Sequence, residues 1–294
     1  MLLSGGLHTA RTNGSEGSTP NLKGGFILEA EPDAAPAGRA PSFHHGDERR
    51  RDILPDREEP ELNRMYEENV KSLNPFVGCL HDCVYCKPSF QAQMKRQKKR
   101  CTLCYDFKPH FHPERLLKPP PRTEEGEFIF FPSMGDPVFC RPDWFLEMRE
   151  YAWRYHDRRF LTQTKNPIRL FEPIREMPNN MFKAATIETN LTEFDTPSKY
   201  KSYSEISKAP PPPRRVCDLD VVTVEPILDF KFNGMVNLIW DIHPEIVYIG
   251  YDNHNCRLPE PPLKKTLELI EKLEKFAEVR RKTIRKAWYE EASP

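Results

Sequence analysis

Short apolar runs alternate with amphipathic stretches from about residue 61 to residue 280. Each apolar run is four to six residues long and is followed by polar residues, a pattern typical of buried strands. We predict strands within the segments Glu127–Asp136, Arg159–Lys165, Met181–Asn190, Asp220–Phe230 and Glu245–Asn253. A further strand before Cys79 brings the expected number of strand–helix units to six.

The stretches between these runs predict helices. In residues 142–156, apolar side chains recur on one helical face, and residues 166–177 begin with Asn166 as an N-cap and Pro167 at the first position. Residues 232–242 predict a third helix, and a final helix is expected from about Pro262 to Trp288. Strands that alternate with helices favour an α/β fold with a parallel sheet.

The regions outside this pattern differ in composition. Residues 1–60 are rich in Gly, Ser, Pro, Ala, Glu and Arg, so we expect a disordered tail. Residues 61–280 would form the folded body, with an insertion at 87–122, and residues 281–294 a C-terminal extension. Residues 191–215 interrupt the strand–helix pattern and contain four consecutive prolines, so we expect a surface excursion or a lid.

Charge and hydropathy exclude some classes of function. Lys plus Arg and Asp plus Glu both number 44, so the net charge of zero provides no overall positive field for nucleic acid. No apolar run approaches the roughly 20 residues that span a bilayer, and the start has too short an apolar stretch for a secretory signal. We therefore expect a cytoplasmic protein without a membrane partner. Clustered cysteines in such a compartment indicate metal or redox chemistry.

Polar residues gather where the predicted strands end. In parallel barrels this carboxyl edge holds the active site, although polar loops also begin there for no functional reason. The residues concerned are Ser133, Gly135, Asp136, Lys165, Glu188, Asn190, Glu225 and Asp252. We expect Lys165, Glu225 and Asp252 to contact substrate or transfer protons, with a buried salt-bridge network as the competing interpretation.

Three of the eight cysteines, Cys79, Cys83 and Cys86, have the spacing C-x3-C-x2-C. Structural zinc normally takes four protein ligands, whereas an iron–sulfur cube held by three cysteines keeps one iron free for another ligand. A zinc site and three buried thiols are the alternatives. We expect the neighbouring His81 to be a loop residue that faces solvent.

The motif, with Tyr85 between its last two cysteines, resembles that of the radical S-adenosylmethionine superfamily. The segments NPFVGC, LTQTKNP, TIETN and VEPILDF are similar to those of a group of radical proteins related to spore photoproduct lyase and to phage-encoded proteins. The resemblance covers about residues 70–275. It implies a partial (β/α)6 TIM-like barrel, a 4Fe–4S cluster and S-adenosylmethionine as cofactors, and a reductant such as flavodoxin or ferredoxin. The substrate could be a nucleic acid or a peptide.

The resemblance also implies roles for matching residues. Cys79, Cys83 and Cys86 would bind the 4Fe–4S cluster, and Tyr85 would lie near the adenine of S-adenosylmethionine. Ser133, Gly135 and Asp136 occupy the place of the turn that receives the amino group of the cofactor, with Gly-Asp in place of the usual Gly-Gly-Glu. Glu188 and Asn190 would contact the ribose hydroxyls.

A second group of metal-ligand types lies in the insertion: Cys101, Cys104, His110 and His112. Two thiols and two imidazoles suffice for tetrahedral zinc, while a second iron–sulfur cluster or no metal at all remain alternatives. The basic run at residues 95–100 could contact phosphate, or it could be a solvated helix end. Together these features leave a second hypothesis, a zinc-dependent nucleic-acid-binding protein without catalysis.

Overall fold

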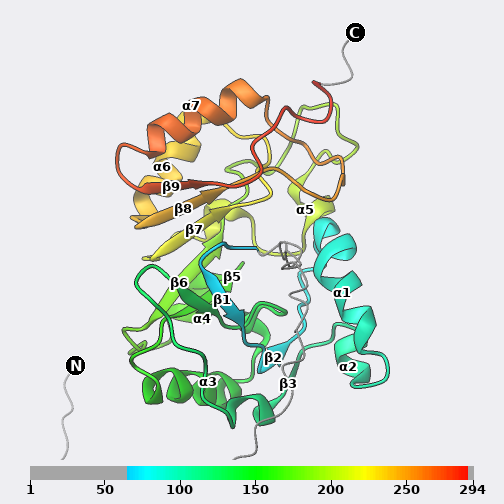
Figure 1. Ribbon diagram of the computed structural model, residues 1–294. Helices are drawn as coiled ribbons and strands as arrows, with labels where there is room; N and C mark the ends of the chain where they lie inside the picture. Colours follow the sequence, from blue (N-terminus) through cyan, green and yellow to red (C-terminus); the bar gives the residue numbers. More distant parts are fainter. Residues whose placement is uncertain (1–64, 291–294) are drawn as a thin grey trace, which may run out of the picture. The chain divides into compact units, whose positions relative to one another are not determined.

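The computed structural model describes residues 65–290. The predicted disordered tail at residues 1–60 lies outside the described residues. Within them, a mixed α/β structure is built on a curled sheet of seven parallel strands, a half-barrel that is compatible with a partial barrel (Figure 1). The strands in their order across the sheet are β1 (Asn69–Ser72), β4 (Phe128–Phe130), β5 (Phe160–Thr164), β6 (Met181–Thr186), β7 (Val221–Val224), β8 (Ile246–Ile249) and β9 (Glu278–Arg281).

Helices connect successive strands, as the alternating pattern predicts. In Figure 1 the helices α6 and α7 lie beside the β8–β9 end of the sheet, α3 lies at the opposite end, and α1 and α2 lie to the right. The helices are α1 (Ala92–Met94), α2 (Thr102–Tyr105), α3 (Pro142–Arg154), α4 (Pro167–Phe171), α5 (Tyr203–Ile206), α6 (Phe232–Ile242) and α7 (Leu263–Leu273). The predicted N-cap of α4 is confirmed, because the side chain of Asn166 accepts a hydrogen bond from the Arg169 amide.

Two separate apolar layers cover the two faces of the sheet. The main core joins strand residues such as Val222 and Val247 to helix residues such as Met148 and Ile239. On the other face, a smaller cluster centres on Tyr66, whose ring packs edge-on against Phe128, Phe130 and Tyr248 at centroid distances of 5.4, 5.3 and 4.6 Å. These rings fill the interior of the half-barrel, because side chains of a strand alternate between its two faces.

The sequence-based prediction of one long final helix is wrong. Helix α7 ends at Leu273, and residues 278–281 form the seventh strand β9, parallel to β8. The strand was missed because its sequence, EVRR, has no apolar alternation. Its position is decided by pairing with β8 and by Arg280, whose side chain donates a hydrogen bond to the Tyr248 hydroxyl at 2.9 Å. The sheet therefore has seven strands where six were expected.

A second, two-stranded sheet lies outside the half-barrel. Strand β2 (Phe76–Val77) pairs antiparallel with β3 (His110–Phe111), with Val77 opposite His110. The pairing joins the segment that leads into Cys79 to the insertion that follows it. The insertion is therefore attached by backbone hydrogen bonds close to the cysteine motif.

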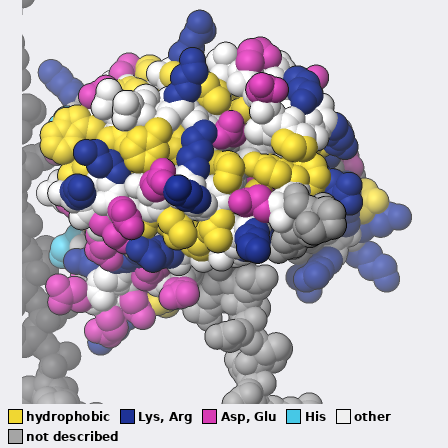
Figure 2. Space-filling model, turned by 90° about the horizontal axis from the view of Figure 1, so that it is seen from above, with side chains coloured by type: hydrophobic (Ala, Val, Ile, Leu, Met, Phe, Trp, Pro, Cys, Tyr) yellow, Lys and Arg dark blue, Asp and Glu magenta, His cyan; other side chains and the backbone are white. Residues whose placement is uncertain are grey.

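The surface carries both signs of charge. Seen from above, acidic and basic side chains are interspersed among hydrophobic ones (Figure 2), which agrees with the zero net charge. Among the described residues, no helix combines the length and the apolar character needed to cross a membrane.

Candidate functional site

A cavity of about 880 Å³ opens at the carboxyl ends of the strands. Its wall includes the residues that directly follow three of the strands, Lys165 after β5, Glu225 after β7 and Lys282 after β9, together with the cysteine motif. Of the site residues predicted from the sequence, it is lined by Cys79, Cys83, Cys86, Tyr85, Ser133, Gly135, Asp136, Lys165, Glu225 and Asp252. This volume lies within the range of about 300–1,000 Å³ that is usual for small-molecule sites.

The cysteine motif forms a compact turn at the wall of this cavity. The Cys86 amide donates to the Cys83 carbonyl at 3.0 Å, which places the last two cysteines on one turn of helix. The neighbouring thiol of Cys86 lowers the pKa of Cys83 to about 6, and the thiol of Cys83 raises the pKa of Cys86 well above its usual range. Burial raises the pKa of Cys79. The three sulfur atoms therefore belong to one electrostatically linked group.

Two glycines bring the cysteine loop against the turn after β4. The Gly78 amide donates to the Met134 carbonyl at 2.9 Å, and the Asp136 amide donates to the Gly78 carbonyl at 3.2 Å. A Cβ atom at position 135 would lie 2.8 Å from the Gly78 oxygen and 2.9 Å from its nitrogen. Glycine is therefore required at 135 because two backbones meet there.

Asp136 ties this turn to the next strand. Its Oδ1 accepts hydrogen bonds from the Thr164 hydroxyl at 2.6 Å and from the Val138 amide at 3.1 Å, and its Oδ2 accepts one from the Lys165 amide at 2.8 Å. Burial raises the pKa of Asp136, but its contact with His81 and these hydrogen bonds outweigh burial and lower that pKa. The Asp136 carboxylate is thus ionised, and both of its oxygens accept hydrogen bonds within the protein.

The expectation that His81 faces solvent is wrong. Its side chain is buried, and its Nε2 lies 3.0 Å from Asp136 Oδ2. Although the two atoms are close, their geometry is not that of a hydrogen bond, and the buried Nε2 has no hydrogen-bond partner among the described residues. The loop at 191–215 lies against the His81 backbone, because the Lys208 amide donates to the His81 carbonyl at 2.7 Å.

Glu188 lies behind the cavity wall in a buried ionic network. Arg215 Nη1 lies 2.8 Å from Glu188 Oε2, and the Tyr85 hydroxyl donates to Glu188 Oε1 at 2.7 Å. Lys165 forms a further ion pair with the same carboxylate. Burial raises the pKa of Glu188, but the charges of Lys165 and Arg215 outweigh it and hold that pKa well below its usual range.

The same network decides the protonation of Lys165. Burial lowers the pKa of Lys165, but Glu188 raises it above its usual value. The amine is therefore a charged partner of Glu188 and cannot accept a proton near neutral pH. This arrangement matches the salt-bridge interpretation that competed with a role in proton transfer.

The remaining predicted residues differ in how they meet the cavity. Glu225 lines it, with Oε2 2.7 Å from Lys282 Nζ. The carboxylate of Asp252 accepts hydrogen bonds from the amides of His254 at 3.1 Å and Cys256 at 2.6 Å, so it shapes its own loop. Asn190 does not line the cavity. Its side chain instead accepts a hydrogen bond from the Lys231 amide at 2.8 Å and donates one to the Lys231 carbonyl at 3.0 Å.

Sequence reasoning missed three residues around the cysteine loop. Arg215 is fully buried against Glu188, and the Ser207 hydroxyl lies 3.1 Å from Cys83 Sγ. Asn74 Oδ1 accepts hydrogen bonds from the amides of Ser133 and Met134, both at 2.7 Å. The loop at 191–215 thus packs on the cysteine motif instead of forming a surface excursion. Only the four prolines before Arg214 hinted at a fixed chain path there.

The four ligand-type residues of the insertion converge on one point. The sulfur atoms of Cys101 and Cys104 and one ring nitrogen each of His110 and His112 all lie within 4.8 Å of one another. The structure therefore brings together a donor set that the sequence could only suggest. Comparisons with family models, with curated proteins and with solved structures found no match to this chain.

Proposed function

We propose that the protein is a radical S-adenosylmethionine enzyme. One observation supports this most: three cysteines with the spacing C-x3-C-x2-C line a cavity at the carboxyl ends of a curled parallel sheet. Such an edge is where parallel α/β folds place their active sites. The finer fold that we propose is the partial (β/α)6 TIM-like barrel of that superfamily, extended here by β9.

The donor set fits a 4Fe–4S cluster with one open iron position. Cys79, Cys83 and Cys86 would supply three thiolates, and none of the other five cysteines, all within the described residues, lines this cavity. Three thiolates favour a cluster that binds a further molecule over structural zinc, which normally takes four protein ligands. Beside them, Cys79, His81 and Asp136 form a second group of possible metal ligands whose ligand atoms all lie within 4.8 Å of one another, and a single ion held there is the competing arrangement. Bound together, the cluster and S-adenosylmethionine would supply a 5′-deoxyadenosyl radical for hydrogen abstraction from the substrate.

The residues of this chain would bind and orient the nucleotide. Tyr85 is fixed by its hydrogen bond to Glu188 and lines the cavity, so its position supports a contact with adenine. Ser133 and Gly135 lie beside the cysteine loop, on the turn proposed for the amino group. Glu188 and Asn190 are occupied elsewhere, so the ribose contacts that the resemblance implies have no support. Glu225 lines the cavity, whereas Glu188 and Asn190 do not, so Glu225 is the carboxylate that we propose for contact with the substrate.

The proposal is tested by anaerobic reconstitution of the full chain with iron and sulfide. We expect about four irons per chain, a brown colour, and 5′-deoxyadenosine by mass spectrometry once dithionite and S-adenosylmethionine are added. Cys83→Ala should lose the colour and the product, whereas Cys217→Ala, half-buried outside the cavity, should retain both. A folded chain that takes up no iron would rule the proposal out.

Substrate and reductant are tested on the reconstituted protein. Pools of tRNA, DNA and peptides are added in turn, and the yield of 5′-deoxyadenosine is compared with and without each pool. Flavodoxin or ferredoxin then replaces dithionite as the electron donor. A colourless protein that carries zinc alone and binds nucleic acid would instead support the second hypothesis, which rests on the exposed cations at residues 95–100 and on the four ligand-type residues of the insertion.

A further inference from the structure

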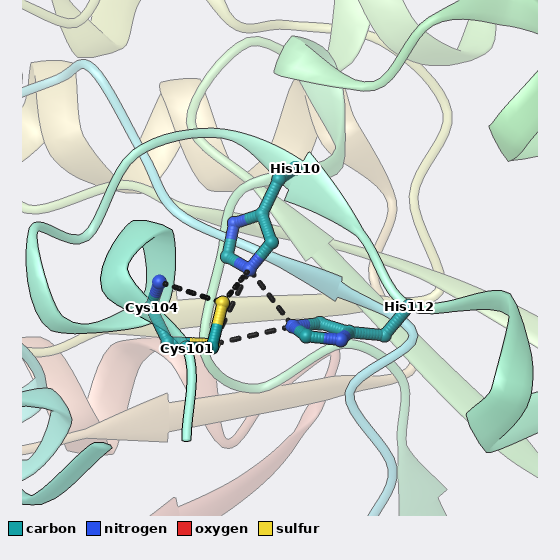
Figure 3. A group of neighbouring side chains, drawn as sticks. All are labelled: Cys101, Cys104, His110 and His112. Carbon is teal, nitrogen blue, oxygen red and sulfur yellow. Dashed lines mark hydrogen bonds between the residues drawn. The ribbon is translucent and has the colours of Figure 1, made fainter. Parts of the chain in front are cut away.

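The insertion contains a preformed four-ligand cluster that the proposed radical chemistry does not use. The Cys104 sulfur lies 3.3 Å from His110 Nε2 and 3.2 Å from His112 Nε2, and the Cys101 sulfur lies 3.4 Å from His110 Nε2. The two imidazole Nε2 atoms are 2.8 Å apart. Figure 3 shows both rings directed at the cysteines, which come from the start of α2, while the histidines come from β3 and the residue after it.

These separations are those of ligands around a single tetrahedral ion. Zinc–sulfur bonds of about 2.3 Å and zinc–nitrogen bonds of about 2.0–2.1 Å give edges of about 3.5 Å between sulfur and nitrogen and about 3.3 Å between nitrogens. An outward movement of about half an ångström or less at each ring would therefore seat zinc. A two-iron cluster with cysteines on one iron and histidines on the other would separate the two ligand types, whereas here they interleave.

Both histidines are already oriented for metal binding through Nε2. His110 Nδ1 lies 2.7 Å from the Lys108 carbonyl, and His112 Nδ1 lies 2.9 Å from Glu114 Oε1. An acceptor on Nδ1 fixes the tautomer that leaves the Nε2 lone pair free, the usual arrangement for zinc-bound histidine. The Cys104 amide also donates to the Cys101 sulfur at 3.4 Å, as expected where that sulfur carries negative charge.

The cluster is attached directly to the loop that carries Cys79. His110 is paired with Val77, and the His112 amide donates to the Pro75 carbonyl at 2.6 Å. The Cys79 amide lies 3.4 Å from the Phe107 carbonyl, and Gly78 fits so tightly that a Cβ there would lie 2.3 Å from the Lys108 backbone. Whatever orders residues 101–112 therefore also orders residues 75–79.

We propose that Cys101, Cys104, His110 and His112 bind one zinc ion, and that this ion holds the cysteine loop in place for the candidate active site. The elements that would otherwise order the insertion are small. Helix α2 has four residues, β3 has two, and the local core consists of Val77, Met94, Cys104 and Phe107. Elements this short are marginal without a metal or another cross-link.

The first test measures metal content in the full chain prepared without iron reconstitution. We expect one zinc per chain in the unmodified protein and in Cys83→Ala, and loss of zinc in Cys104→Ser. Replacement by cobalt(II) should give the visible spectrum of a tetrahedral thiolate site. A folded chain with no stoichiometric zinc, retention of zinc by Cys104→Ser, or iron in place of zinc at this site would overturn the proposal.

A milder variant covers the case in which Cys104→Ser does not fold. Glu114→Gln weakens only the acceptor for His112 and should reduce zinc affinity by about tenfold, the lower end of the range for such changes, because Glu114 is exposed. Glu147→Gln, an exposed glutamate on α3, should leave zinc affinity unchanged. Equal affinities for the two variants would contradict the proposed histidine orientation.

The second test asks whether the ion holds the cysteine loop. Removal of zinc by a chelator should accelerate amide hydrogen exchange at residues 76–80 and 101–112, and leave exchange in β5 and β6 unchanged. Unchanged exchange at 76–80 after zinc has left would refute the coupling while leaving zinc binding intact. Because zinc content and exchange are read without S-adenosylmethionine or an iron–sulfur cluster, the outcome is independent of the proposed radical activity.

Discussion

Arg215 and Glu188 form an ion pair in which both side chains are fully buried, with Nη1 and Oε2 2.8 Å apart. The pair joins the end of the loop at 191–215 to the segment after β6. Tyr203 also donates its hydroxyl to Glu188 Oε1 at 3.0 Å, so the same carboxylate gathers several partners. The ion pair therefore anchors the loop whose Ser207 contacts Cys83.

Breaking this pair should destabilise the fold strongly. Arg215→Met leaves the buried Glu188 carboxylate without one of its two cationic partners, and removal of one partner of a buried pair costs about 3–5 kcal/mol. The free energy of unfolding is measured by urea denaturation. As a control, Asp218→Asn removes the partner of Lys183 in a pair whose aspartate is 89% exposed, where about 0–1 kcal/mol is expected. Similar losses for the two variants would contradict the assignment.

The depressed pKa of Glu188 predicts how stability depends on pH. Because the folded-state pKa lies below the unfolded value of about 4.3, the stabilising contribution is complete above pH 4.3 or so and is lost as pH falls toward the folded pKa. Urea midpoints measured from pH 7 to pH 3 should therefore fall below about pH 4.5. In Glu188→Gln this decline should be shallower, and an unchanged slope would show that other carboxylates cause it.

Gly135→Ala should disturb the cysteine loop. The added Cβ would lie 2.8 Å from the Gly78 oxygen, and overpacking of this kind typically costs about 1–3 kcal/mol. We expect a lower urea midpoint and weaker retention of iron after reconstitution, read from iron content and visible absorbance.

Gly126→Ala is the matched control for this change. Gly126 has a φ of +84° but nothing within 4 Å of its Cβ position. Alanine there costs only the strain of its backbone conformation, about 1 kcal/mol. Iron retention should therefore be unaffected, and a loss of iron in both variants would show that the effect of Gly135→Ala is not specific to the cysteine loop.

Ser207→Ala should change the reduction potential of a cluster bound at Cys83. The Ser207 hydroxyl lies 3.1 Å from Cys83 Sγ, and hydrogen bonds to cluster sulfurs raise the potential because they stabilise the more negative reduced state. Removing the hydroxyl should make the midpoint potential more negative in a titration followed by electron paramagnetic resonance. Ser204→Ala, whose hydroxyl pairs with that of Ser202 instead, should leave the potential unchanged.

Much of the architecture could be predicted from local patterns in the sequence. Five apolar runs became β4, β5, β6, β7 and β8, and α6 begins and ends where the pattern indicated. Apolar periodicity predicts such elements because a buried strand or helix face needs apolar side chains at fixed intervals. The spacing of Cys79, Cys83 and Cys86 likewise indicates a metal-binding loop, because three thiols so close along the chain can reach one metal centre.

Other features depend on contacts between distant segments, and only the tertiary structure decided them. β9 is a strand because β8 offers it a partner, although its own residues are mostly charged. The resemblance implied that Glu188 contacts a nucleotide, but its carboxylate is paired with Arg215, which lies 27 positions away in the sequence. Local sequence fixes which residues can be buried or ionised, whereas the free energy of a buried charge depends on partners that only the folded chain brings within reach.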